Sequence, residues 1–76
     1  MSLKPLSARK VIQVLVKIGF KVARQRGSHV VLKHLDGRVT VVPMHPREKI
    51  GRGLLLKIIK DAKLTREEFL KLLEEV

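Results

Sequence analysis

The chain has 76 residues, of which 17 are Lys or Arg and 7 are Asp or Glu, giving a formal net charge of +10. A chain of this length is expected to form one domain over residues 1–76, because domains below about 100 residues rarely divide. The absence of cysteine excludes disulfides, thiolate zinc sites and cysteine nucleophiles. With two Phe and no Trp or Tyr, the composition also argues against aromatic platforms on which bases stack.

The first predicted element is a helix that follows Ser7, a residue suited to the N-cap position. Apolar side chains then recur at helical spacing over residues 11–18 and form one face. Gly19 ends this helix, because glycine adopts the left-handed backbone that commonly closes helices, and Phe20 then folds back onto the last turn. Three short strands are expected next, at residues 20–25, 29–34 and 38–42.

Asp36-Gly37 predicts a two-residue hairpin turn between the second and third strands. With alternating side chains, Val30 and Leu32 then share a face with Val39 and Val41, and we expect the helices to cover that face. The opposite face is expected to carry His29, Val31, Lys33, Arg38 and Thr40.

Two more helices complete the predicted fold. The second begins near residues 51–53, and the third follows a capping box formed by Thr65 and Glu68. The order is α-β-β-β-α-α, an α+β fold with a three-stranded antiparallel sheet and the helices on one face. No secretory signal is visible and the apolar segment 11–20 is too short to span a bilayer, so we expect a cytoplasmic protein without a membrane partner.

The charge is distributed unevenly along the chain. Residues 1–60 hold fourteen basic and two acidic side chains, a surplus of twelve, whereas residues 61–76 hold three basic and five acidic ones. A surplus of this size attracts polyanions through phosphate contacts and release of counterions. We therefore expect a nucleic-acid partner, with a merely basic, well-solvated domain as the alternative.

The spacing of histidines and carboxylates argues against a metal site. His29 and His34 lie on opposite faces of one predicted strand, so they cannot share an ion. His45 has Glu48 three residues later, but no further ligand completes the three or four groups that zinc requires. The carboxylates are also not clustered as two-metal nucleases need. We expect no metal and no cofactor.

Metal-free cleavage of RNA remains chemically possible. A base removes the proton of a 2′-hydroxyl, which attacks the adjacent phosphorus while an acid protonates the leaving 5′-oxygen. Histidine suits both steps because its ordinary pKa is about 6.5, and arginine or lysine offsets the charge of the phosphorane. These residue types gather around one tight turn, at Arg24, Arg26, Gly27, Ser28 and His29. The alternative is that His29 is an ordinary exposed residue beside a solvated basic edge.

Several segments resemble the HicA toxin family, also called YcfA-like proteins, in the same order and spacing. They are Gly19-Phe20, Arg24-Gln25-Arg26-Gly27-Ser28-His29, Val42-Pro43-Met44-His45, Gly53-Leu54-Leu55 and Glu67-Glu68-Phe69-Leu70. The resemblance implies a double-stranded-RNA-binding-like fold and an mRNA interferase, a toxin that cleaves mRNA and is held inactive by a HicB-type antitoxin. It also implies that His29 is catalytic. Many members have Gly-Thr-Leu in place of Gly53-Leu54-Leu55, so no role is carried over to Gly53 or Leu54.

From the resemblance and the residue chemistry together, His29 is expected to be the general base, with water or His45 supplying the proton to the leaving group. Phosphates are expected to contact Arg24, Arg26 and Lys33. The remaining expected RNA-binding residues are Gly27, Ser28, His45, Lys49, Arg52, Lys57 and Lys60.

Two other functions stay open at this point. A module of this fold can bind structured RNA by shape and phosphate contacts without cutting it, and that needs no histidine. A DNA-associated regulator is the second alternative, although three strands separate the first two helices and no helix-turn-helix pair is formed. An acidic antitoxin that covers His29 is the expected protein partner, since electrostatic attraction speeds such encounters.

Overall fold

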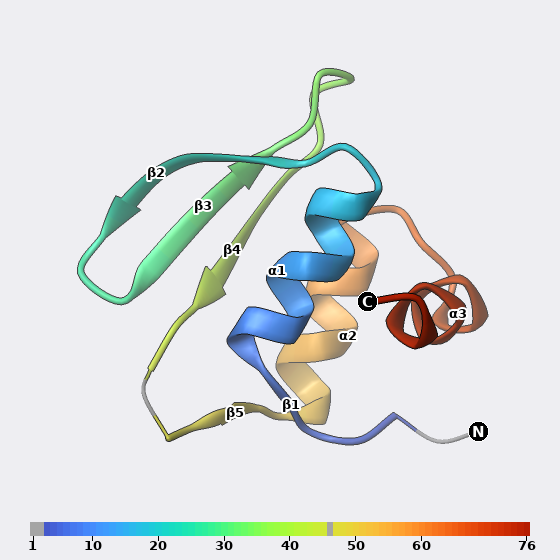
Figure 1. Ribbon diagram of the computed structural model, residues 1–76. Helices are drawn as coiled ribbons and strands as arrows, with labels where there is room; N and C mark the ends of the chain where they lie inside the picture. Colours follow the sequence, from blue (N-terminus) through green and yellow to red (C-terminus); the bar gives the residue numbers. More distant parts are fainter. Residues whose placement is uncertain (1–2, 46) are drawn as a thin grey trace.

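The computed structural model describes residues 3–45 and 47–76. Strands β2, β3 and β4 form an antiparallel sheet in that order, and β1 pairs with β5 in a separate two-stranded ribbon (Figure 1). The elements are β1 (Leu6–Ser7), α1 (Ala8–Lys17), β2 (Lys21–Arg26), β3 (His29–Lys33), β4 (Val39–Pro43), β5 (Lys49–Ile50), α2 (Arg52–Asp61) and α3 (Arg66–Glu74). The predicted α+β layout is confirmed, whereas the β1–β5 ribbon was not predicted.

Helix α1 is closed at both ends as its sequence predicts. The Ser7 hydroxyl accepts a hydrogen bond from the Lys10 amide at 3.2 Å, which satisfies a free N–H group of the first turn. At the other end Gly19 has φ +103°, and the Phe20 amide donates to the Leu15 carbonyl at 3.0 Å. This Schellman-type closure turns the chain sharply and places Phe20, only 1% exposed, in the core.

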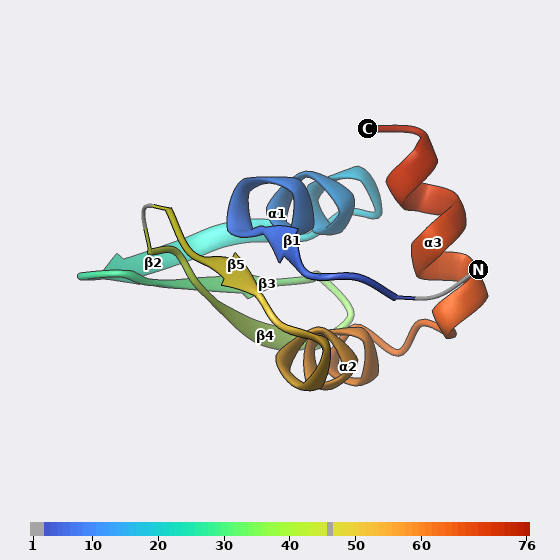
Figure 2. The same cartoon turned by 90° about the horizontal axis from the view of Figure 1, so that it is seen from below.

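The core lies between one face of the sheet and the helices. Alternate residues of β3 are buried while their neighbours are exposed or half-buried, so a single face of the sheet is covered. Figure 2 shows α1 and α2 apart from each other, with β1 and β5 between them, and α3 at the end of the molecule away from the β2–β3 turn. The largest fully buried side chains are Phe20, Phe69, Leu15, Leu32, Leu55, Ile58, Val11, Val14 and Val42. None of the helices in the described part of the chain has the length and apolar character needed to cross a membrane.

The predicted orientation of β4 is wrong by one residue. Leu32 pairs with Thr40, and Val30 pairs with Val42, so Thr40 and Val42 face the core and are 2% and 0% exposed. Val39 and Val41, expected in the core, are 45% and 38% exposed on the other face. A shift of one residue in strand register moves every side chain to the opposite face.

The cause of this shift is the length of the β3–β4 turn. The His34 amide donates to the Arg38 carbonyl at 2.8 Å, so the loop contains three residues rather than the predicted two. Gly37 has φ +98°, as in three-residue hairpins that end with a left-handed residue. Arg38 was expected on the face away from the helices but therefore lies on the core side. There the Cζ atom of its guanidinium is 5.2 Å from the centroid of the Phe20 ring.

The Thr40 side chain is satisfied although it is buried. Its hydroxyl donates to the Asp61 carboxylate at 3.0 Å, which links β4 to the end of α2. The Arg38 guanidinium donates to the Ala62 carbonyl at 2.6 Å and pairs with Asp36 at 2.8 Å. The hydrogen bond from Arg38 lowers the pKa of the Asp36 carboxyl.

Candidate functional site

A β-bulge in β2 determines which side chains lie together on the face of the sheet that the helices do not cover, here called the open face. The pairing shifts by one residue between Val22 and Arg24, so that Arg24 lies opposite Val31 and Arg26 lies opposite His29. Because directly opposed residues share a face, both arginines lie with His29 on the face that the helices do not cover. Simple alternation would have placed Val22 and the two arginines on one face.

His29 begins β3 directly after the tight turn of Gly27 and Ser28. Gly27 has φ +55°, a left-handed conformation that favours glycine. The Gln25 side-chain amide donates to the Gly27 carbonyl at 3.2 Å and ties the turn to its own strand. The turn is thus a short, internally bonded segment that presents an exposed His29 at the edge of the open face.

His45 is brought to His29 by an extension of the β3–β4 pairing. His29 lies opposite Pro43, and the Met44 amide donates to the Ser28 carbonyl, which fastens the two segments together one residue beyond the strands. The His29 and His45 ring centroids are 6.5 Å apart, and the ring planes are inclined by 80°. Both side chains are exposed, so the pair is open to a ligand.

The rest of the open face is cationic at the β2 edge and apolar across β4. Three cross-strand rows follow from the pairing: Arg26, His29 and Pro43; Arg24, Val31 and Val41; and Lys21, Lys33 and Val39. Lys21 was not among the predicted residues. Its position beside Lys33 depends on the strand register, for which the sequence alone gives no reliable signal.

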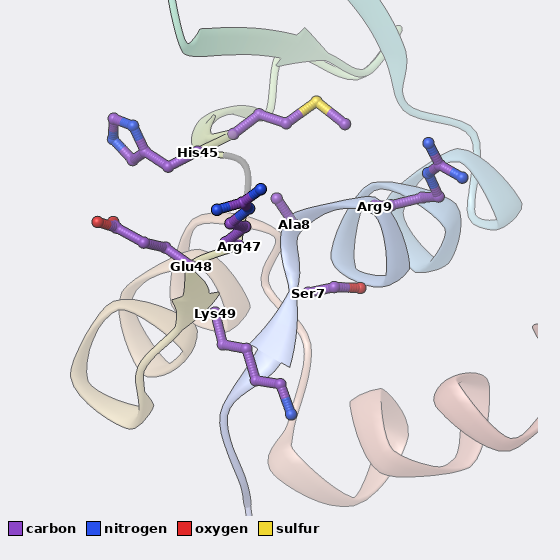
Figure 3. A pocket seen from close by; sticks show the side chains of 8 residues that line it. Ser7, Ala8, Arg9, His45, Arg47, Glu48 and Lys49 are labelled. Atoms are coloured by element: carbon purple, nitrogen blue, oxygen red, sulfur yellow. The ribbon is translucent and has the colours of Figure 1, made fainter.

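The loop after β4 and the start of α1 enclose a pocket. β1 pairs with β5, with Ser7 opposite Lys49, and this pairing brings the first turn of α1 to the loop that carries His45. The pocket has a volume of about 550 Å³ and is shown in Figure 3. It is lined by Ser7, Ala8, Arg9, Met44, His45, Arg47, Glu48 and Lys49. Of these residues, sequence analysis identified only His45 and Lys49 as site residues.

A comparison with protein-family models matches residues 8–64 to the HicA toxin of bacterial toxin–antitoxin systems. The chain belongs to the HicA toxin family. The matched segment contains both His29 and His45, while α3 lies beyond its end. Membership makes the chain the toxin member of a toxin–antitoxin pair, for which an antitoxin is the implied partner. A comparison with curated proteins gives no match.

The cationic residues of α2 in this HicA chain are spread over the length of the helix. Arg52 is its first residue, close to the loop of His45, whereas Lys57 and Lys60 belong to its second half. The Lys57 ammonium pairs with the Asp61 carboxylate at 3.0 Å, and Asp61 also accepts from Thr40. Lys57 therefore has a carboxylate partner, and it lies away from the end of β4 at which the histidines meet.

His34 has a structural role in the HicA fold. Its Nε2 lies 3.0 Å from the Ile18 carbonyl, and because a carbonyl only accepts, Nε2 carries the proton. Its Nδ1 accepts from the Asp36 amide at 3.2 Å, and the ring meets Phe20 edge to face at 5.3 Å. These contacts join the end of α1 to the β3–β4 turn. No cluster of three His, Asp or Glu side chains suited to a metal ion occurs among residues 3–45 and 47–76.

Proposed function

We propose that this HicA toxin is an endoribonuclease that cleaves mRNA without a metal ion. The observation that carries the proposal is the exposed pair of His29 and His45, whose ring centroids are 6.5 Å apart, next to Arg26 on the open face of the sheet. Two histidines at this separation can act on the two oxygens of one phosphodiester, and a neighbouring guanidinium can hold its phosphate.

In the proposed reaction His29 is the general base. It takes the proton of the 2′-hydroxyl, the oxygen attacks the adjacent phosphorus, and the bond from phosphorus to the 5′-oxygen breaks. The leaving oxygen takes a proton from His45 or from water, leaving a 2′,3′-cyclic phosphate and a 5′-hydroxyl end. Histidine serves either step near neutral pH because its ordinary pKa of about 6.5 keeps both protonation states populated.

Arginines supply the electrostatic part of this mechanism. Arg26 lies directly opposite His29 and Arg24 lies in the next row of the open face, so both can reach phosphates that flank the scissile one. A guanidinium binds phosphate oxygens in a bidentate manner and stabilises the negative charge that grows on the phosphorane. Lys33 and Lys21, in the third row, extend the contact to further phosphates.

Cleavage of RNA in excess EDTA tests the proposal. Wild type is compared with His29→Ala and with Gln13→Ala, an exposed α1 control, after circular dichroism has shown equal fold content. We expect cleavage by wild type and the control and a loss of at least about 100-fold in His29→Ala, in line with a missing general base. Equal cleavage by His29→Ala refutes the assignment, and RNA binding without cleavage by any variant favours a non-catalytic RNA-binding module.

The same assay decides the role of His45. If His45 is the acid, the rate of wild type falls on both sides of an optimum, and His45→Ala removes the fall on the alkaline side. A log-rate profile with a single ionisation in wild type assigns the leaving-group proton to water.

We infer that the antitoxin blocks the open face. This face carries Arg24, Arg26 and Lys33 around His29, so an acidic HicB-type protein is the complementary partner. Mixing the pair is expected to protect His29 from modification by diethyl pyrocarbonate and to suppress cleavage. Full reactivity of His29 in a stable complex contradicts this arrangement.

A further inference from the structure

The 550 Å³ pocket beside His45 adjoins the histidine pair, and the proposed mechanism does not use it. Its volume lies within the range of about 300–1,000 Å³ that is usual for small-ligand sites. Buried Ala8 and half-buried Met44 give the pocket an apolar wall, and charged side chains form much of the remaining lining. His45 belongs to its lining, so a group bound there lies next to any phosphate held between His45 and His29.

An RNA chain bound at the histidines needs a place for an adjacent base, and this chain has no exposed Phe, Tyr or Trp on which that base could stack. Phe20 and Phe69 are the only Phe residues, Trp and Tyr are absent, and both Phe side chains are buried. Bases in RNA complexes also stack on guanidinium planes, and methionine sulfur makes favourable contacts with aromatic rings. Arg47 and Met44 provide these two surfaces in the pocket.

Glu48 is the feature of the pocket that phosphate binding does not explain. It is the only carboxylate in the sequence between Asp36 and Asp61, and a negative charge on a phosphate-binding surface repels the phosphates of the RNA backbone. Its amide donates to the His45 carbonyl at 3.2 Å, which holds it on the same turn as the histidine, and Figure 3 shows both side chains extending to one side of the loop. No Lys, Arg or His of the described residues lies within ion-pair distance of its carboxylate.

We infer that the pocket formed by Ala8, Met44, Arg47 and Glu48 beside His45 is a nucleobase subsite that selects a base with an exocyclic amino group. The Glu48 carboxylate accepts hydrogen bonds from that amino group, as acidic side chains do with the N4 amino group of cytosine. Uracil carries the O4 carbonyl oxygen where cytosine carries the N4 amino group, and this oxygen repels the carboxylate. The inference rests on the proposed function for its choice of RNA as ligand.

Cytosine and uracil give the sharpest test, because they have the same size and differ in the groups on this edge. The probes are 2′-O-methyl dinucleotides of cytidine and of uridine, which lack the attacking hydroxyl and cannot be cleaved. Binding to the ¹⁵N-labelled full chain is followed by NMR. We expect the cytidine probe to bind about tenfold more tightly, the usual discrimination of one good base contact, with the largest shifts at the amides of Ala8, Met44 and Glu48.

Two variants complete the experiment. Glu48→Gln is expected to abolish the preference for cytidine. Glu67→Gln, the same change of charge on the distant α3, is expected to leave both affinities and the preference for cytidine unchanged. Equal binding of the two probes by wild type, an unchanged preference in Glu48→Gln, or shifts confined to other residues overturns the subsite. Since no bond is cleaved in this assay, its failure is independent of a failure of the His29 cleavage test.

Discussion

The contribution of Arg26 to RNA binding can be worked out from its surroundings. Arg26 is exposed, lies opposite His29, and has no carboxylate within ion-pair distance among the described residues. Its full charge is therefore available to one phosphate. Each phosphate neutralised on a single strand contributes about 0.7 to the slope of log affinity against log salt. Arg26→Gln is thus expected to lower the slope by about 0.7. Between about 50 and 200 mM salt, a slope of about 0.7 corresponds to a loss of affinity of about 2.6-fold, and the variant is expected to lack this part of the loss.

Lys57 provides the contrast, because its ammonium is 3.0 Å from Asp61. Lys57→Gln removes a charge that is already paired, and we expect it to change the slope by less than half as much as Arg26→Gln. Arg66→Gln on α3 is the matched control for loss of one arginine and is expected to leave the slope unchanged.

The assay is fluorescence anisotropy of a labelled 2′-O-methyl oligonucleotide, titrated at several salt concentrations in EDTA. The reasoning is refuted if Arg26→Gln leaves the slope unchanged, or if Lys57→Gln lowers it as much as Arg26→Gln does. The first result would remove the open sheet face from the RNA contact, and the second would move the contact toward the second half of α2.

Two further predictions concern the turns that position the site. Val42→Thr puts a hydroxyl at a fully buried position and is expected to lower the free energy of unfolding by about 1–3 kcal/mol. Val41→Thr makes the same change on the open face and is expected to alter the free energy of unfolding by less than about 0.5 kcal/mol. Both values are measured by urea denaturation. A larger loss for Val41→Thr than for Val42→Thr would place β4 in the other register. Gly19→Ala gives a left-handed residue a Cβ 2.8 Å from the His34 Nε2 atom and is expected to cost about 2 kcal/mol in the same assay. Wild-type stability would contradict both the strain of the left-handed backbone at residue 19 and the close contact with the His34 ring.

Local sequence signals predicted the helices and their ends. Ser7, Gly19 and the Thr65 capping box act through hydrogen bonds to residues within five positions, and each is present as expected. Such contacts depend on nearby residue types alone, which the sequence displays directly. The α+β layout follows because each segment also has the apolar period of its element.

The register of the sheet was not predictable in the same way. Asp36-Gly37 is compatible with a two-residue turn, but in the folded chain Gly37 closes a three-residue loop. Two-residue and three-residue hairpin loops favour the same residue types, and the strand pairings that they produce differ by one residue. The core decides between them, because the observed register buries Val42 and lets Thr40 bond to Asp61, a residue 21 positions away.

The candidate site was predicted in its residue types but not in its geometry. His29 and the arginines of residues 24–26 were identified from the turn sequence, and His45 from the family resemblance. Their assembly depends on the β2 bulge and on the Met44 bond to Ser28, neither of which has a local signature. The pocket depends further on the β1–β5 pairing, which involves only two residues in each strand and joins segments more than forty positions apart.

The acidic residues of the chain are arranged so that they leave the site positive. Asp36 pairs with Arg38, Asp61 with Lys57, and Glu75 with Lys17, all outside the histidine region. Most other carboxylates lie on α3, which both views place at the end of the molecule away from the β2–β3 turn (Figures 1 and 2). Because charges are screened beyond about 8 Å at physiological salt, these carboxylates do not cancel the field at His29. Glu48 is the exception, and a carboxylate retained in that field is better explained by contact with a base than by contact with phosphate.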